Sequence, residues 1–420
     1  MSFYVSAPGK VILFGEHSAV YGKPAIAAAL SLRAYLLVVP SEKSDEIVLE
    51  FPDIQLKHKW NLSDIPWELI NEHLTKKDGK PDVTEELVPE ILDQLADLLA
   101  DTENNLHYIA CRCFLYLYVN LCGPETPGCH FCIRLTLPIG AGLGSSASTA
   151  VCLSTALAKL GGHLTSPELK LNDKHLRKDT PDANFIDSWS LMGEKCFHGN
   201  PSGIDNAVAT HGGAVLYQRM KGPGNPSVRT SVRNFSALKL LLTNTKVPRS
   251  TAELVGGVAQ INTLFPKISE SILDAMEHVS NDAYQLMVQP FFDKSELSAL
   301  VNINHGLLVA LGVSHPSLEK IKIIADLHKI GATKLTGAGG GGCAITLLNE
   351  NVGEDELAAV EKEFEQNGFE TFTTMLGGKG VGLLEGEGDM FSTEKLAGFQ
   401  DRDEIEAAVG ASTLDGWRFW

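Results

Sequence analysis

The part of this sequence best suited to chemistry is a glycine- and serine-rich stretch at residues 138–147, Pro-Ile-Gly-Ala-Gly-Leu-Gly-Ser-Ser-Ala. Alternating apolar residues at 130–137 predict a strand before it, and the alanine- and leucine-rich residues 147–160 predict a helix after it. Glycine permits positive φ and lets a ligand approach the backbone closely. Because the free N–H groups and the positive dipole end of the helix would face that ligand, we expect a phosphate-binding loop.

This loop follows neither of the two most familiar phosphate-binding patterns. A P-loop would carry a lysine after its last glycine, and a dinucleotide fingerprint would have a different glycine spacing. Ser145 and Ser146 have two possible roles, as caps of the helix or as hydroxyl ligands of a metal ion. The alternative to a phosphate site is an ordinary glycine-rich turn with a serine cap, because glycine motifs alone often match by chance.

Two acidic residues follow farther along the chain. A helix expected over residues 183–197 carries Glu194, and the glycine- and proline-containing segment behind it carries Asp205. Their position at the end of a buried helix predicts that they lie at the mouth of a site. Each also has an ordinary explanation: Glu194 as a solvated surface acid, and Asp205 as the cap of a helix that begins at Asn206.

Charged residues near the N-terminus lie between apolar elements. Two short strands are expected there, separated by Ala-Pro-Gly-Lys at 7–10, and Gly-Glu-His follows at 15–17. These loops place Lys10, Glu16 and His17 beside buried strands, where they are candidate ligands of an anionic substrate. For His17 the alternative is a hydrogen-bonded residue of the core.

The second half of the chain contains a helical region and a second glycine loop. A strand at 238–242 leads through Thr243 into a polar turn, and helices are expected from there to about residue 330. Thr-Gly-Ala-Gly-Gly-Gly-Gly at 336–342 then lies between two short strands. This order of elements predicts an α+β protein with two glycine loops.

Length and composition bound the class of protein. A chain of 420 residues is longer than a single core usually supports, so two domains are expected. The net charge of −17 argues against nucleic acid or an acidic membrane as the main partner, so an anionic substrate would need locally focused positive groups. The eight cysteines lack zinc-ligand spacing and no secretory signal is seen, so we expect reduced thiols in a cytosolic protein.

Four groups of motifs now coincide in a fixed order: 7–10 with 15–17, then 138–147, then Gly193 and Glu194 with Asn-Pro-Ser-Gly-Ile-Asp-Asn at 200–206, then 336–342. This order resembles the GHMP small-molecule kinase superfamily. The detail of residues 15–23, 198–203 and 242–249 is similar to the branch of that superfamily that phosphorylates mevalonate. The resemblance covers most of residues 4–348 and is absent after about 385.

The resemblance implies a two-domain α+β fold with ATP and substrate between the domains. The N-terminal domain, residues 1–228, would be of the ribosomal-S5 second-domain type, and the C-terminal domain, residues 229–420, would be ferredoxin-like. We expect the glycine- and proline-containing residues 221–227 to be the linker, and the acidic, glycine-dotted residues 385–420 to be a loosely packed tail. The implied reaction transfers the γ-phosphoryl group of ATP to the C5 hydroxyl of (R)-mevalonate, in isoprenoid and sterol precursor synthesis.

The resemblance also implies a role for each candidate residue. Asp205 would accept or aim the proton of the substrate hydroxyl, and Lys10 would neutralise charge at the reaction centre and pair with Asp205. Ser146 and Glu194 would hold Mg²⁺. The substrate-binding residues would be Lys10, Glu16, His17, Asp205 and Thr243. The residues around ATP would be Pro138, Gly140, Ala141, Gly142, Leu143, Gly144, Ser145, Ser146 and Ala147.

Two other interpretations stay open. One is another member of the superfamily, such as a galactokinase, a homoserine kinase or a phosphomevalonate kinase, although the sugar motif of galactokinases is missing near the N-terminus. The other is an inactive relative that binds its ligand as a sensor. Such a protein is expected to lose Lys10, Glu194 or Asp205, and all three are present. The family further suggests feedback inhibition by prenyl diphosphates and a homodimer.

Overall fold

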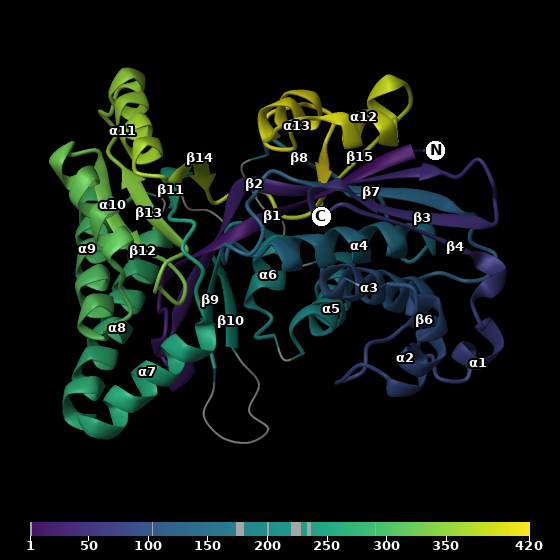
Figure 1. The fold of residues 1–420 in the computed structure, drawn as a ribbon, viewed down its shortest axis with the longest axis horizontal. Coiled ribbons are helices and arrows are strands. Elements are labelled where there is room, and N and C mark those ends of the chain that lie inside the picture. Colours follow the sequence, from purple (N-terminus) through teal and green to yellow (C-terminus); the bar gives the residue numbers. More distant parts are fainter. Residues whose placement is uncertain are drawn as a thin grey trace.

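The computed structural model describes residues 2–102, 104–173, 180–199, 201–219, 228–232, 237–289 and 291–420. Within them, fourteen strands form one continuous sheet with helices on both faces (Figure 1). The strands of this sheet are β1 (Ser2–Phe14), β2 (Ala25–Pro40), β3 (Glu46–Phe51), β4 (Leu56–Asn61), β7 (Cys129–Leu135), β8 (Leu169–Lys170), β9 (Ala214–Gln218), β10 (Val228–Val232), β11 (Leu238–Asn244), β12 (Gly331–Leu335), β13 (Cys343–Leu348), β14 (Glu370–Leu376), β15 (Gly382–Gly386) and β16 (Arg418–Phe419). β5 (Lys76–Lys77) and β6 (Lys80–Pro81) form a separate hairpin.

The helices fall into three groups along the chain. The α-helices are α1 (Trp67–Asn71), α2 (Pro89–Leu95), α3 (Asn105–Leu121), α4 (Ser145–Leu160), α5 (Pro181–His198), α6 (Ile204–His211), α7 (Thr251–Leu264), α8 (Pro266–Met287), α9 (Lys294–Ala310), α10 (Pro316–Leu327), α11 (Glu354–Gln366), α12 (Thr393–Gly398) and α13 (Arg402–Val409). Figure 1 shows α3 to α6 under one face of the N-terminal part of the sheet, α8 to α11 beside the C-terminal part, and α12 and α13 over the face opposite α4. No described helix is long and apolar enough to cross a membrane.

The N-terminal half is organised by β1 and β2, which pair antiparallel along most of their lengths. The sequence predicted two short strands at the start of the chain, and the structure corrects this to the single strand β1. Its register against β2 shifts between Pro8 and Lys10. Proline cannot donate to the ladder, and a bulge accommodates it without ending the strand.

The C-terminal half pairs its strands in the order β12-β13-β11-β14, all antiparallel. Its long helix α8 buries residues three or four positions apart, including Leu273, Met276, Val279 and Ala283, as an amphipathic helix must. The two halves share one sheet, because β14 pairs with β2 through Leu376 and Leu30. The sheet is therefore continuous across the place where the halves meet.

The prediction of a loosely packed C-terminal tail is wrong. Residues 385–420 form α12, α13 and β16, and β16 pairs with both β15 and β8. Trp417 and Phe419 are buried in a cluster that also contains Tyr4 and Tyr35 of the central strands. Aromatic side chains bury large apolar areas, so a few of them outweigh the acidic composition of the segment. We call residues 385–420 the C-terminal cap.

The predicted linker, residues 221–227, lies outside the described residues. β10 begins at Val228, next to the predicted domain boundary, and pairs with β9 of the N-terminal half. The domain boundary between residues 228 and 229 therefore stays a prediction. In the structure, β10 pairs with a strand of the N-terminal half.

Candidate active site

The first glycine loop joins β7 to α4, as the sequence predicted. Gly140, Gly142 and Gly144 have φ of 74°, 83° and 75°, where only glycine is unstrained. A Cβ on Gly144 would lie 2.9 Å from Cγ of Lys10, so a side chain at that position would also clash. Gly144 is the N-cap of α4, and Ser145 is the first helical residue. Neither serine is therefore the N-cap of the helix, and the metal-ligand role of the Ser146 hydroxyl stays a prediction.

A lysine–aspartate pair lies against this loop. The Nζ of Lys10 is 3.1 Å from an oxygen of Asp205, and the side chains of the two residues are 8% and 28% exposed. The backbone N–H of Lys10 donates to the carbonyl of Leu143 at 2.8 Å, which ties the β1 bulge to the loop. α6 begins at Ile204 with Gly203 as its N-cap, so Asp205 is not the cap. Its carboxylate faces the cleft.

Glu194 lies on α5 and is almost completely buried. Burial raises the pKa of Glu194 to about 7; the nearby Asp205 contributes to this rise, while Ser146 and Lys10 oppose it. Among the residues that the structure describes, one of its oxygens, Oε1, has no hydrogen-bond partner. A buried carboxylate oxygen without a partner is unfavourable unless a cation or proton joins it.

A magnesium ion fits this arrangement. Mg²⁺ typically takes one or two protein carboxylates together with phosphate oxygens and water, and it does not need an all-protein cage. Among the described residues there is no cluster of three or more acidic, histidine or cysteine side chains. The orphaned oxygen of Glu194 and the nearby hydroxyl of Ser146 are the two protein oxygens that would face such an ion.

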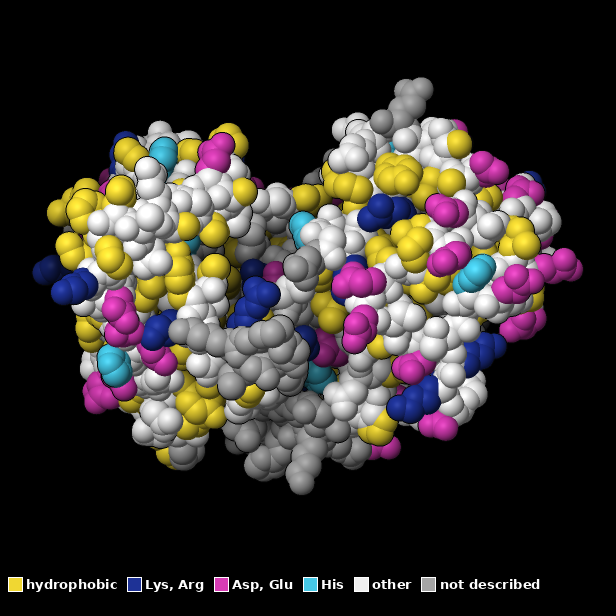
Figure 2. Space-filling model, turned by 90° about the horizontal axis from the view of Figure 1, so that it is seen from below, with side chains coloured by type: hydrophobic (Ala, Val, Ile, Leu, Met, Phe, Trp, Pro, Cys, Tyr) yellow, Lys and Arg dark blue, Asp and Glu magenta, His cyan; other side chains and the backbone are white. Residues whose placement is uncertain are grey.

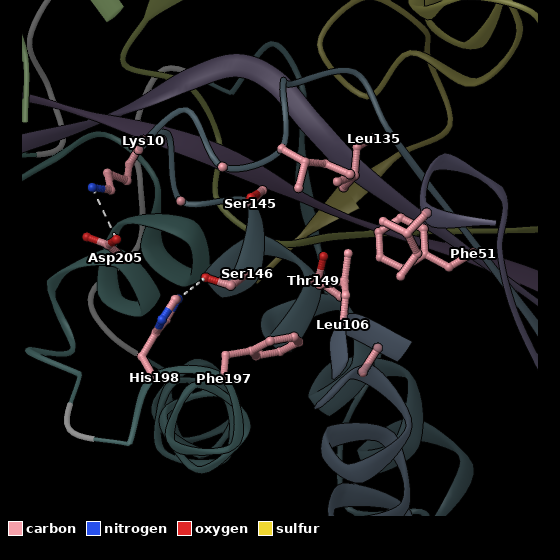
Figure 3. A pocket seen from close by; sticks show the side chains of 16 residues that line it. Lys10, Phe51, Leu106, Leu135, Ser145, Ser146, Thr149, Phe197, His198 and Asp205 are labelled. Carbon is pink, nitrogen blue, oxygen red and sulfur yellow. Dashed lines mark hydrogen bonds and ion pairs between the residues drawn. The ribbon is translucent and has the colours of Figure 1, made fainter. Parts of the chain in front are cut away.

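A cavity of about 320 Å³ runs along the loop (Figure 3). Its polar end carries Lys10, Asp205 and Ser146, and the Ser146 hydroxyl is 3.0 Å from Nε2 of His198. Its other end is apolar, with Phe51 and Leu135 on one wall. The full lining is Lys10, Phe51, Ile54, Leu106, Ala110, Leu135, Ile139, Gly140, Gly142, Gly144, Ser145, Ser146, Thr149, Phe197, His198 and Asp205.

The structure brings together only part of the predicted set. Among the predicted residues, the cavity lining contains Lys10, Gly140, Gly142, Gly144, Ser145, Ser146 and Asp205. The remaining loop residues act through their backbone or pack in the core: Leu143 and Ala147 are buried, and Ala141 offers its carbonyl to an arginine described below. Pro138 is half-buried at the start of the loop. Glu194 is close enough to Ser146 for the Ser146 hydroxyl to lower its pKa.

Glu16 and His17 do not line this cavity. The side chain of Glu16 is fully buried, with one oxygen in an ion pair with Lys334 and the other accepting from Asn304 at 2.9 Å. Its oxygens are therefore occupied, and the structure does not support a direct contact between Glu16 and substrate. His17, at φ 45°, places Nε2 2.8 Å from the carbonyl of Ala338 in the second glycine loop.

Thr243 lies on β11 and is buried, and its hydroxyl has no hydrogen-bond partner within the described part of the chain. It does not line the 320 Å³ cavity. An unsatisfied buried hydroxyl is a cost that a ligand can remove. Thr243 therefore stays a predicted substrate residue, and no hydrogen bond joins it to Lys10 or Asp205 among the described residues.

Sequence reasoning missed Arg249. This side chain, in the turn between β11 and α7, donates to the carbonyls of Ala141 at 3.2 Å and of Thr336 at 3.4 Å, so it connects both glycine loops. A Cβ on Gly142 would lie 2.1 Å from Nη2 of Arg249, and one on Gly342 would lie 2.6 Å from Nη1. The signal was visible, since the polar turn after the strand at 238–242 carries the arginine, but an arginine in a turn is usually ordinary surface charge.

Basic and acidic side chains lie close together where the halves meet. Figure 2 shows lysine and arginine side chains in the middle of one face, between the two lobes, with acidic side chains beside them. The basic side chains among them are the locally placed positive groups that a chain with a net charge of −17 needs to attract an anion.

Two family models match the chain, one in each half. Residues 105–213 match the model described as GHMP kinases N terminal domain, and residues 287–366 match the model described as GHMP kinases C terminal. The fold and the site thus define a small-molecule kinase of the GHMP class, and the predicted two-domain α+β fold is confirmed.

Individual relatives narrow the class. The chain is 60% identical to mevalonate kinase of Candida albicans over 100% of this chain and 99% of the relative, and 43% identical to mevalonate kinase of Saccharomyces cerevisiae over 91% and 90%. A crystal structure of L. major mevalonate kinase in complex with R-mevalonate is 25% identical, with a TM-score of 0.61 over 89% of this chain and 96% of that one. The chain belongs to the mevalonate kinase family.

Proposed function

We propose that this protein transfers the γ-phosphoryl group of ATP to the C5 hydroxyl of (R)-mevalonate, giving 5-phosphomevalonate for isoprenoid and sterol precursor synthesis. The observation that carries the proposal is the Lys10–Asp205 pair at 3.1 Å, held against a glycine loop at the start of a helix. The loop suits a polyphosphate, and the pair suits a hydroxyl next to it. The full-length similarity to mevalonate kinases supports the choice of substrate.

In this mechanism the protein mainly positions and stabilises charge. The transition state of phosphoryl transfer is loose, so an alcohol need not be deprotonated early. Asp205 accepts a hydrogen bond from the attacking hydroxyl and receives its proton as the new bond forms. Lys10 keeps Asp205 oriented and neutralises charge on the transferring group. The N–H groups at the start of α4 hold the phosphates.

Glu194 and Ser146 would hold Mg²⁺ beside the phosphates, and the ion would neutralise charge on the β- and γ-phosphate oxygens. The support is the buried, unpartnered Oε1 of Glu194 with the Ser146 hydroxyl nearby. His198 orients that hydroxyl from the other side. The apolar end of the cavity, with Phe51 and Leu135, suits the adenine base.

For the substrate side we propose two different roles. Thr243 contributes a hydroxyl that lacks a partner within the described residues. Glu16 and His17 act indirectly, because Glu16 pairs with Lys334 and His17 contacts the second glycine loop. Together they hold the N-terminal loop against β12 and residues 336–342.

The remaining expectations belong to the same proposal. We assign residues 1–228 to the N-terminal domain and residues 229–420 to the C-terminal domain. We further propose that the protein lies in the cytosol, forms a homodimer and is inhibited by prenyl diphosphates, as its family suggests. All eight cysteines are free and buried, which supports a reducing compartment.

A coupled ADP-release assay tests the function across mevalonate, phosphomevalonate, galactose and homoserine. A site that pairs with a substrate hydroxyl and carboxylate should reject galactose, which lacks the carboxylate, and phosphomevalonate, whose C5 hydroxyl is already phosphorylated, by as much as ~10⁴-fold. Homoserine carries both groups, so its rejection depends on its ammonium group and its different chain length. We expect turnover with mevalonate alone. Comparable turnover of another acceptor would overturn the substrate but not the class, and binding of mevalonate and ATP without ADP release would favour an inactive sensor.

A further inference from the structure

Arg134 connects the apolar wall of the cavity to the C-terminal cap. Arg134 and Leu135 are neighbours on β7, so their side chains lie on opposite faces of the sheet. Leu135 lines the cavity, while Arg134 is buried beneath the cap. Its Nη1 donates to the carbonyls of Leu396, Ala397 and Phe399 at 2.9, 3.3 and 2.9 Å.

The same arginine holds the other half of the wall. Its Nε donates to Oδ1 of Asp53 at 2.9 Å, and Oδ2 of Asp53 accepts from the backbone N–H of Leu135 at 2.8 Å. Phe51 and Ile54, which flank Asp53 in the chain, both line the cavity. Asp53 thus fixes the distance between the turn that carries these two side chains and the strand that carries Leu135.

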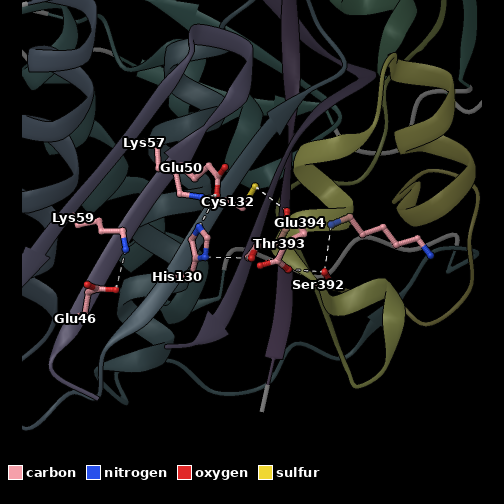
Figure 4. A network of polar contacts seen from close by, with 10 residues as sticks. Glu46, Glu50, Lys57, Lys59, His130, Cys132, Ser392, Thr393 and Glu394 are labelled. Carbon is pink, nitrogen blue, oxygen red and sulfur yellow. Dashed lines mark hydrogen bonds and ion pairs between the residues drawn. The ribbon is translucent and has the colours of Figure 1, made fainter. Parts of the chain in front are cut away.

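A second connection lies four residues earlier on the same strand (Figure 4). His130 of β7 has one ring nitrogen 2.7 Å from Glu50 and the other 3.2 Å from the hydroxyl of Thr393, the first residue of α12. Glu50 directly precedes Phe51. Two independent polar links therefore run from the C-terminal cap, through β7, to the residues of the cavity wall.

We propose that Arg134 is a positioning residue for the nucleotide base, and that through it the C-terminal cap sets the shape of the base subsite. The proposal rests on the proposed function, because it takes the apolar end of the cavity as the base subsite. The triphosphate contacts the glycine loop, which none of these links touches. A variant that loses the link should therefore bind the base more weakly and bind the phosphates as before.

The test compares two probes, ATP and inorganic tripolyphosphate, in equilibrium binding to the full chain. Arg134→Met removes the donors and keeps the apolar stem. We expect the dissociation constant for ATP to rise about 10-fold, equivalent to about 1.4 kcal/mol, and that for tripolyphosphate to stay within about 2-fold. In turnover, KM for ATP should rise while KM for mevalonate and kcat stay nearly unchanged.

Arg402→Met is the matched control, because Arg402 is another arginine contact of the same cap. It donates to the carbonyl of Thr371 at 3.3 Å and lies over the ring of Phe372, away from the cavity. This variant should leave the dissociation constants for ATP and tripolyphosphate unchanged. If Arg134→Met fails to fold, Asp53→Asn and Thr393→Val each remove one link with little change of volume. Each should raise the dissociation constant for ATP, by less than Arg134→Met, and leave that for tripolyphosphate unchanged.

Unchanged ATP binding in the link variants, or equal weakening of both probes, would overturn the proposal. The binding measurements need no turnover, so they separate this inference from the assigned reaction. If the wild-type protein does not phosphorylate mevalonate but Arg134→Met still weakens the binding of ATP and not of tripolyphosphate, the proposed reaction is wrong and the proposed role of Arg134 stands.

Discussion

Nη2 of Arg249 donates to the carbonyl of Ala141 at 3.2 Å, so a side chain from the C-terminal half holds the glycine loop of the N-terminal half. Nη1 of the same guanidinium reaches the carbonyl of Thr336, at the start of the second glycine loop. The planar fork of arginine suits this double contact, which a single ammonium group cannot reproduce. The proposed phosphate-binding loop therefore depends on a contact between the two halves.

We predict that Arg249→Met lowers kcat/KM for ATP by roughly 10- to 100-fold, because the loop loses its anchor and the phosphates are misplaced. Arg249→Lys should recover little of the loss. Steady-state kinetics with varied ATP measures the effect. The control is Lys246→Met, which removes an exposed charge from the same turn and should leave kcat/KM unchanged. Full recovery by Arg249→Lys would mean that charge alone matters.

Asp205→Asn should lower kcat by roughly 10²–10⁴-fold with little change in ATP affinity, as expected for a group that receives a proton in the transition state. Lys10→Met should also lower kcat. Because the two side chains form one ion pair, the double variant should lose less than the product of the single losses. Rapid single-turnover measurements on the three variants check these expectations. Near-wild-type turnover of Asp205→Asn would show that Asp205 does not take part in the mechanism.

The sequence predicted the elements that carry local signals. The first glycine loop, its strand and its helix lie where alternation and alanine-rich composition predicted them. The C-terminal cap was missed because its stability comes from distant partners: Trp417 packs on Tyr35, and the Tyr35 hydroxyl in turn donates to Glu406. No local pattern in an acidic, glycine-containing segment reports such contacts.

The site shows the same limit. Lys10 and Asp205 could be named because they belong to motifs, but the sequence could not distinguish a residue that lines the cavity from one that supports it. Glu16 has the residue type of a ligand, and only the structure shows that Lys334 and Asn304 occupy it. Arg249 and Arg134 act through backbone carbonyls on other elements, so their roles depend on tertiary geometry.

The Lys334–Glu16 pair leads to a prediction about stability. Both side chains are completely buried, and burial lowers the pKa of Lys334 while the pairing with Glu16 opposes that change. Removing one partner leaves an uncompensated charge, so Lys334→Met should lower the free energy of unfolding by about 3–5 kcal/mol. The double variant with Glu16→Gln should recover part of this loss. Urea denaturation measures both values.

Lys322→Met is the control for that prediction, because Lys322 pairs with Asp326 near the surface. Such exposed pairs contribute about 0–1 kcal/mol. A similar small change for Lys334→Met would show that the buried pair is dispensable for the fold.

Glu194 predicts a pH-dependent stability in the metal-free protein. Its pKa is raised from 4.5 to about 7, so between these pH values the folded state holds a proton that the unfolded state has lost. The stabilisation is complete below about pH 4.5 and is lost as pH rises through about 7. The difference in unfolding free energy between wild type and Glu194→Gln should therefore change by about 3 kcal/mol across this window. A constant difference between the two proteins would contradict the shift.

The same carboxylate predicts how the enzyme responds to magnesium. Above pH 7 the ionised Glu194 would offer a full negative charge to the ion, and Ser146 would add only a neutral hydroxyl. Glu194→Gln should raise the Mg²⁺ concentration for half-maximal rate by at least ~10-fold, and excess Mg²⁺ should partly restore kcat. Ser146→Ala should have a milder effect, since a hydroxyl is the weaker ligand. Direct Mn²⁺ binding in the presence of a non-hydrolysable ATP analogue provides a readout that does not depend on turnover. If Glu194→Gln leaves metal binding unchanged and alters only the melting temperature, Glu194 is a structural acid and the metal assignment fails.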